Sequence, residues 1–154
     1  MTGSTRAAGT PTDPVLAAGV LLWAGESTEP RFLLLQNARH SSWGFPKGHA
    51  DAGDADIYAT ALREVAEETG YELSRAALHP SYADSHAYQP TGEHWKRVVH
   101  FLATEPVDPD ALRASDEHAD VAWLTVEDAL ERLAHPELQR ALVRADEALS
   151  LASA

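Results

Sequence analysis

Three glutamates on one turn of a predicted helix restrict the possible functions of this chain more than any other pattern in it. The segment that carries them, Asp56 to Thr69, lacks Gly and Pro and is rich in Ala, Glu, Leu and Arg, all good helix formers. Asp54 or Asp56 is placed to cap its start, and Gly70 is placed to end it in a left-handed conformation. The apolar residues that recur every fourth position form its buried face: Ile57, Ala61 and Val65.

Glu64, Glu67 and Glu68 lie at positions i, i+3 and i+4, so their side chains leave the same turn. Like charges at this spacing destabilise a helix, and the helix dipole disfavours negative charge near a C-terminus. A divalent cation would offset both effects, since Mg²⁺ binds carboxylates, waters and substrate phosphates. The alternative is a solvated acidic helix face, which is common. Lys47 and Gly48, ahead of the helix, favour the metal site, because glycine lets a ligand approach the backbone and lysine can pair with phosphate.

The composition excludes several classes of protein. The chain has 154 residues and no cysteine, which excludes a disulfide framework, a thiol nucleophile and a zinc–thiolate site. Neither a secretory signal nor a membrane-spanning run is visible, so we expect a cytoplasmic protein without membrane attachment. We expect a disordered tail over residues 1–14, rich in Thr, Gly, Ala and Pro, and a single domain over residues 15–154.

The formal net charge of −12 disfavours a long nucleic acid or an anionic membrane as partner, because both need a basic surface. A nucleotide can still bind through metal ions and local lysines. We therefore expect a small-molecule nucleotide as substrate and a dependence on divalent cations. The sequence carries no signal for an oligomeric state.

Apolar runs and turn residues predict an α/β sandwich with a mixed sheet, in which strands surround the central helix and two helices follow. Thr125 is placed to cap the first of these two helices, and Pro136 to separate them. The expected strands cover residues 15–23, 31–36, 81–88, 96–104 and 115–124, and the expected later helices cover residues 126–134 and 137–149.

The central stretch resembles the Nudix box. Gly48, Asp54 and the run Arg63-Glu64-Val65-Ala66-Glu67-Glu68-Thr69-Gly70-Tyr71 follow the order of that motif. Asp54 stands where the family has glutamate, and eight residues rather than seven separate it from Arg63. Both departures concern the carboxylate–arginine pair that braces the box, not the metal-binding turn.

This resemblance implies a Nudix α/β/α sandwich that uses Mg²⁺ or Mn²⁺ to hydrolyse a nucleoside diphosphate linked to another group. Asp54 and Arg63 match the structural brace of the box. Glu64 and Glu117 are both candidates for the general base, and His118 accompanies Glu117. The residues that match the metal ligands are Gly48, Glu64, Glu67 and Glu68.

Residues 15–149 further resemble the asymmetrical diadenosine tetraphosphate (Ap4A) hydrolases within this superfamily. Three segments carry the resemblance: FLLLQ at 32–36, W-x-x-P-K-G-H at 43–49 and SDEHADVAWLTVEDAL at 115–130. It implies asymmetric cleavage of Ap4A to ATP and AMP. Lys47 and Lys96 match lysines that contact phosphate, and Tyr88 matches a tyrosine placed to stack on adenine. His40, in a predicted loop, is a further candidate for a ligand contact.

Two alternatives remain open at this stage. The same site would serve longer diadenosine polyphosphates or the 5′ triphosphate end of RNA. A non-catalytic nucleotide sensor on a Nudix scaffold is the alternative from another class. Loss of box carboxylates would be the signature of such a sensor, and the presence of Glu64, Glu67 and Glu68 therefore favours an enzyme.

Overall fold

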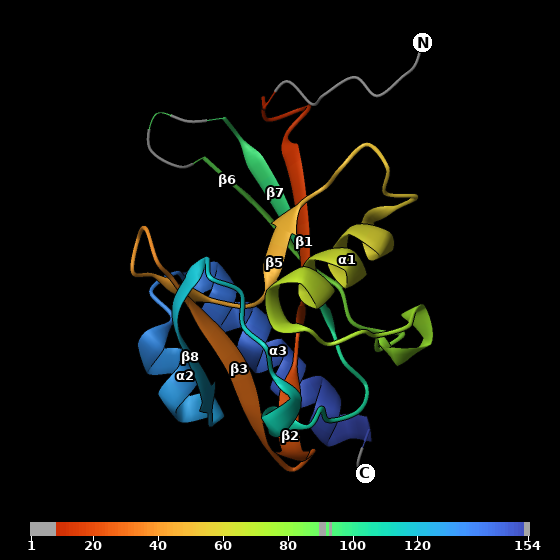
Figure 1. Cartoon of the computed structure of the whole chain (residues 1–154), viewed down its shortest axis with the longest axis vertical. Coiled ribbons are helices and arrows are strands. Elements are labelled where there is room, and N and C mark those ends of the chain that lie inside the picture. The colour runs from red at the N-terminus through yellow and green to blue at the C-terminus, as the bar shows by residue number, and fades with distance from the viewer. Residues whose placement is uncertain (1–8, 90–91, 93, 153–154) are drawn as a thin grey trace.

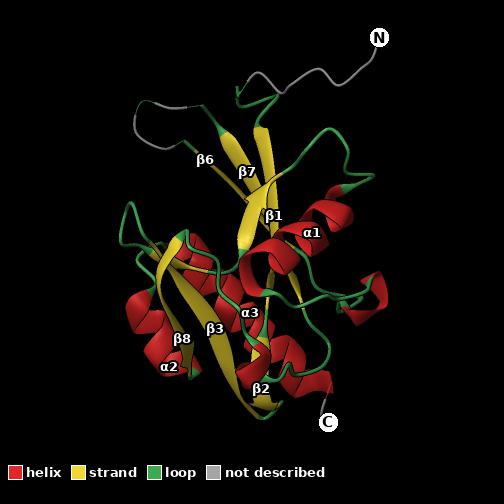
Figure 2. Ribbon diagram, viewed as in Figure 1, coloured by secondary structure: helices red, strands yellow, loops and turns green. Residues whose placement is uncertain are grey.

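The computed structural model describes residues 9–89, 92 and 94–152, which form two sheets and the helices around them (Figures 1 and 2). The elements in chain order are β1 (Val15–Leu21), β2 (Trp23–Glu26), β3 (Glu29–Asn37), β4 (Trp43–Gly44), β5 (Lys47–His49), α1 (Ile57–Thr69), the 3₁₀ turn η1 (Arg75–Ala77), β6 (Asp84–Tyr88), β7 (Lys96–Leu102), the 3₁₀ turn η2 (Pro109–Ala111), β8 (His118–Leu124), α2 (Val126–Arg132) and α3 (Pro136–Ala152).

The predicted mixed sheet is present, with strand order β5-β1-β7-β6. Strands β1 and β7 are parallel, from Val15 opposite Lys96 to Leu21 opposite Leu102, and the other two pairs are antiparallel. A second sheet, in which β3 pairs with β2, β4 and β8, is antiparallel throughout. The single strand expected over residues 15–23 is therefore divided. The Leu22 carbonyl already accepts from Leu33 in the second sheet, and a continuous apolar run does not mark where a chain changes sheet.

Helix α1 begins and ends as its sequence predicts. The Asp56 side chain accepts a hydrogen bond from the Ala59 N–H at 2.8 Å, so Asp56 rather than Asp54 is the N-cap. Gly70 has a φ of 80° and its N–H bonds the Ala66 carbonyl. Ala61 and Val65 are fully buried against the mixed sheet, which places the glutamates at its edge.

Helix α3 lies on the opposite face of the mixed sheet from α1 (Figure 1). The buried Asp84 on β6 pairs with Arg140 and Arg144 of α3, and the Tyr82 hydroxyl donates to the Ala141 carbonyl at 2.6 Å. Helix α2 packs on β3 and β8 of the second sheet. The resulting arrangement is the α/β/α fold that was predicted.

The helix and strand ends differ from the prediction by a few residues. Strand β6 starts at Asp84, because Tyr82 turns inward to α3, and β8 starts at His118, after a turn closed by its N–H on the Ser115 carbonyl. Thr125 caps α2 as predicted, at 3.2 Å from the Asp128 nitrogen, but α2 ends at Arg132. Helix α3 is longer than predicted and extends to Ala152.

The structure describes only a part of the predicted N-terminal tail. Residues 1–8 lie outside the described residues, whereas the Gly9 carbonyl accepts a hydrogen bond from Trp95 at 2.7 Å. The predicted loop between β6 and β7 includes residues 90, 91 and 93, which are also outside the described part. None of the helices among the described residues combines the length and apolar composition needed to cross a bilayer.

Candidate active site

The brace predicted between Asp54 and Arg63 is formed. Arg63 binds both carboxylate oxygens of Asp54, with Nε at 2.9 Å and Nη2 at 3.0 Å, and the same carboxylate accepts from the Thr60 hydroxyl and the Asp51 N–H. These hydrogen bonds, that from Arg63 above all, hold the pKa of Asp54 far below its usual range. The loop before α1 is thereby fixed to the first two turns of the helix.

The Arg63 guanidinium also reaches the box glutamates and strand β5. Its Nη1 lies 2.9 Å from Glu67 Oε2 and 3.4 Å from Glu64 Oε2, and its Nη2 donates to the His49 carbonyl at 3.0 Å. The hydrogen bonds to Asp54 and the charge of Glu64 raise the pKa of Arg63. One guanidinium therefore joins the loop, the helix and the strand that surround the glutamates.

Glu64 occupies the space that a side chain at residue 48 would need. A Cβ built on Gly48 would lie 2.0 Å from the Glu64 carboxylate, so any larger residue at this position would force that carboxylate to move. Burial raises the pKa of Glu64, and the charge of Glu67 adds to this effect while Arg63 opposes it. The carboxylate is thus partly desolvated and held between β5 and Arg63.

Glu68 is buried and connects α1 to β5 and to the loop before β8. It accepts the Lys47 backbone N–H at 2.8 Å, its Oε1 lies 3.7 Å from His118 Nε2, and its carbonyl accepts from the Ser115 N–H. Burial raises the pKa of Glu68 to about 8, against the opposing Lys47 N–H, and the charges of Glu64 and Glu117 raise it further. Glu117 itself is exposed but near enough to act on Glu68.

This donor set fits a hard divalent cation such as Mg²⁺ or Mn²⁺. Burial raises the pKa of both Glu64 and Glu68. A bound divalent cation would neutralise these carboxylates and offset the free-energy cost of burying their charge. Among the described residues, no three His, Asp, Glu or Cys side chains are grouped so that they could hold a metal ion by themselves. Mg²⁺ is usually bound by one or two carboxylates and completes its coordination with waters and substrate phosphates.

Basic and aromatic side chains meet on the face of the mixed sheet opposite α1. Residues that pair across strands share a face, so the register places five polar residues together there. We call this set the lysine face: Lys47, His49, His86, Tyr88 and Lys96. Lys47 and Lys96 take part in none of the salt bridges among the described residues. Burial lowers the pKa of Lys47, partly opposed by the charge of Glu68, and an anionic ligand would pair with this ammonium.

The structure joins most of the predicted residues but not His40. That residue lies in the exposed turn after β3, where its N–H donates to the Asn37 side chain, and no contact among the described residues joins it to the glutamates. His86 and His100 were missed by the sequence analysis. The signal for His100 was the alternation of Lys96, Val98 and His100 along β7, and that for His86 was its alternation with Tyr88 along β6.

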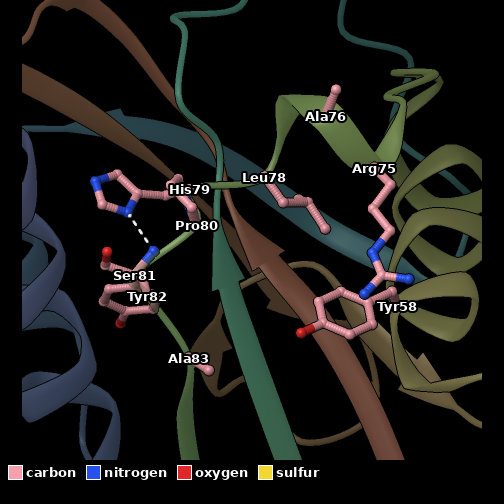
Figure 3. A pocket seen from close by; sticks show the side chains of 9 residues that line it. All are labelled: Tyr58, Arg75, Ala76, Leu78, His79, Pro80, Ser81, Tyr82 and Ala83. Carbon is pink, nitrogen blue, oxygen red and sulfur yellow. Dashed lines mark hydrogen bonds between the residues drawn. The ribbon is translucent and has the colours of Figure 1, made fainter.

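A separate pocket of about 660 Å³ lies beside η1 (Figure 3). The Arg75 guanidinium lies 3.7 Å from the centre of the Tyr58 ring, and the Ser81 N–H donates to His79 Nδ1 at 3.1 Å. No residue that lines this pocket is a predicted site residue. The candidate active site is therefore at the edge of the mixed sheet and not in this pocket.

The chain is similar to known proteins over most of its length. The model of the NUDIX domain family matches residues 13–145. An asymmetrical bis(5′-nucleosyl)-tetraphosphatase of Caenorhabditis elegans is 31% identical over 125 residues, which cover 80% of this chain and 88% of the relative. The Rattus norvegicus protein of the same name is 35% identical over 119 residues, covering 76% and 79%.

A solved structure is similar in fold as well. The crystal structure of a C. elegans Ap4A hydrolase in a binary complex aligns with a TM-score of 0.75 and 29% identity. The alignment covers 91% of this chain and 99% of the other. The similarity therefore includes the elements that position the glutamates and the lysine face.

Proposed function

This chain belongs to the NUDIX domain family, and we propose that it hydrolyses diadenosine tetraphosphate asymmetrically to ATP and AMP, with Mg²⁺ or Mn²⁺ bound by Gly48, Glu64, Glu67 and Glu68. The observation that carries the proposal is the position of Lys47. Its backbone N–H binds Glu68, while its side chain belongs to the lysine face with Lys96 and Tyr88. A small nucleotide as partner and a cytoplasmic location belong to the same proposal.

The lysine face suits a phosphate chain that ends in a purine. Lys47 and Lys96 would bind phosphate oxygens, and Tyr88, opposite Lys96 in the strand register, would stack on one adenine ring. The Glu64 carboxylate lies just across β5, next to Gly48. A bound polyphosphate would thus extend from the adenine subsite at Tyr88 to the glutamates.

The reaction is the attack of water on a phosphorus atom, in line with the bridging oxygen that leaves. When bound, the divalent cation supplies neutralisation of phosphate charge and lowers the pKa of water. We assign the proton-accepting role to Glu64, because Gly48 and Arg63 fix its carboxylate and burial raises its pKa, whereas Glu117 is exposed. Glu64 accepts one water proton, the bond from phosphorus to the bridging oxygen breaks, and AMP and ATP separate.

The alternatives use the same glutamates in different ways. Longer diadenosine polyphosphates would need more contacts along the lysine face. A long RNA is disfavoured by the net charge of −12. A nucleotide sensor would not need the box carboxylates, and the retention of Glu64, Glu67 and Glu68 therefore favours the enzyme.

Incubation with Ap4A and Mg²⁺ in ¹⁸O-labelled water, followed by mass spectrometry of the products, tests the proposal. We expect ATP and AMP, with the label in one of them. Two ADP molecules would establish symmetric cleavage and reject the proposed positioning of the chain. Parallel reactions with diadenosine penta- and hexaphosphate and with triphosphorylated RNA compare the alternative substrates. Binding of Ap4A without turnover under Mg²⁺ and Mn²⁺ would favour the sensor.

A further inference from the structure

His100 is a fully buried histidine whose two ring nitrogens have no hydrogen-bond partner within the described residues. Its ring lies edge-on to Phe45, with centroids 5.4 Å apart, and 6.2 Å from the ring of His86. A buried polar group without a partner lowers stability, and an apolar residue of similar size would avoid this cost. A histidine at this position therefore calls for a functional reason.

The strand register places His100 behind Lys47. Lys47 on β5 pairs with Gly19 on β1, and Gly19 pairs with His100 on β7, so the three form one row on one face of the sheet. A Cβ on Gly19 would lie 2.6 Å from the Lys47 Cβ and 1.9 Å from the Pro46 carbonyl oxygen. The Lys47 side chain therefore uses the space left by Gly19, and the residue between it and His100 in this row has no side chain.

The environment keeps His100 uncharged. Burial lowers its pKa to about 3, and the charges of Lys47 and His86 contribute to the shift. A neutral imidazole has one N–H donor and one nitrogen that accepts a hydrogen bond. An ammonium group has three donors and no acceptor, so it is suited to the accepting nitrogen.

We propose that His100 is a positioning residue for phosphate binding: its neutral imidazole offers a hydrogen-bond acceptor that directs the Lys47 ammonium across Gly19 toward the bound phosphate chain. The inference deepens the proposed function and rests on it for the identity of the phosphate compound. It assigns a specific role to a residue that lies outside the box and is not one of the five residues that define the lysine face. His100 has no contact with the reacting atoms in this role and acts through Lys47.

Two variants of nearly equal size, His100→Gln and His100→Met, compare a side chain that has a hydrogen-bond acceptor with one that has none. We expect His100→Met to raise the KM for Ap4A about tenfold, the effect of losing one hydrogen bond to a charged group, with kcat within about twofold of wild type. His100→Gln retains an acceptor and should keep KM within about twofold of wild type. Equal KM values for the two variants would overturn the proposal, whatever their stabilities.

A second measurement keeps this test independent of the substrate. Calorimetric titration with inorganic tripolyphosphate, in a chelator and without metal, reports on anion binding at the lysine face without a contribution from the metal. We expect the dissociation constant to rise in His100→Met and not in His100→Gln. If Ap4A is not a substrate but this difference is present, the proposed function fails and the role of His100 stands. If Ap4A is cleaved and the two variants bind alike, the role of His100 fails.

Tyr82→Phe is the matched control for an effect of packing. Tyr82 is buried, and its hydroxyl donates to the Ala141 carbonyl on α3. It has no part in the proposed phosphate binding. Its loss should lower the melting temperature by a few degrees and leave KM unchanged. A KM change in Tyr82→Phe as large as that in His100→Met would show that altered packing alone explains the His100 effect, and would overturn the proposal.

Discussion

Arg63 binds both carboxylate oxygens of Asp54, with Nε 2.9 Å from Oδ1 and Nη2 3.0 Å from Oδ2. The family motif has glutamate at this position and one residue fewer before the arginine. Aspartate is one methylene shorter, and in this longer loop its carboxylate still reaches Arg63. The same guanidinium then reaches Glu67 at 2.9 Å, so the brace determines where this glutamate lies.

Replacement of Asp54 by Asn should lower the free energy of unfolding by about 1.5–3 kcal/mol at pH 7, since a hydrogen-bonded charge pair is lost. Asp54 has a folded pKa below its unfolded value of about 3.9, so its contribution is present above that value and is lost as the pH falls through the folded pKa. Urea denaturation at pH 7, 5 and 3 measures this. The free energies of unfolding of the wild type and of Asp54→Asn should be closer at pH 3 than at pH 7. Equal stability of the two at pH 7 would contradict the prediction.

Gly48→Ala should lower kcat about 100-fold, because the new Cβ would lie 2.0 Å from the Glu64 carboxylate and displace it. Gly53→Ala is the control, since a Cβ at that loop position meets no atom within 4 Å. Steady-state kinetics of the two variants with Ap4A provide the comparison. Activity of Gly48→Ala close to that of Gly53→Ala would mean that the position of Glu64 does not matter for turnover.

Glu67→Gln should remove most activity while the protein stays folded, because the Glu67 side chain is more than half exposed and contributes little to packing. We expect a loss of two to three orders of magnitude in kcat, roughly the effect of removing one group that stabilises charge in the transition state. Glu72→Gln makes the same chemical change at an exposed residue outside the box. Near-normal turnover of Glu67→Gln with an unchanged melting temperature would exclude Glu67 from the metal site.

The raised pKa of Glu68 predicts how stability depends on pH. Its folded pKa of about 8 exceeds the unfolded value of about 4.3, so its contribution is fully present below pH 4.3 and is lost as the pH rises to 8. In a chelator, stability should therefore fall from pH 5 to pH 8 through this group, and Mg²⁺ should reduce the fall. Calorimetry in buffers of different ionisation enthalpy should show proton release on Mg²⁺ binding at pH 7. Binding without proton release would place the cation away from Glu68.

Local signals sufficed for the parts of the site within one helix. The caps Asp56 and Gly70, the buried Ala61 and Val65, and the glutamates of one turn depend on helical spacing over short distances in the chain. The same holds for Thr125 at the start of α2. The resemblance of the box to a known motif also lies within this continuous segment.

Contacts between segments that are distant in the sequence could not be predicted from such local signals. Residues 15–23 form one apolar run in the sequence, but β1 and β2 belong to different sheets, because strand pairing depends on partners far along the chain. The backbone hydrogen bond from Lys47 to Glu68 and the exposed position of His40 likewise depend on how β5 and the loops pack.

The sequence by itself determined the helix with its three glutamates, the lack of cysteine chemistry and the membership suggested by the box. Only the tertiary structure decided that Lys47, Gly19 and His100 form one row, and that Asp54 meets Arg63 despite the longer loop. The physical reason is that the alternation along a strand assigns each residue to a face, whereas its neighbours on that face are set by the register between strands.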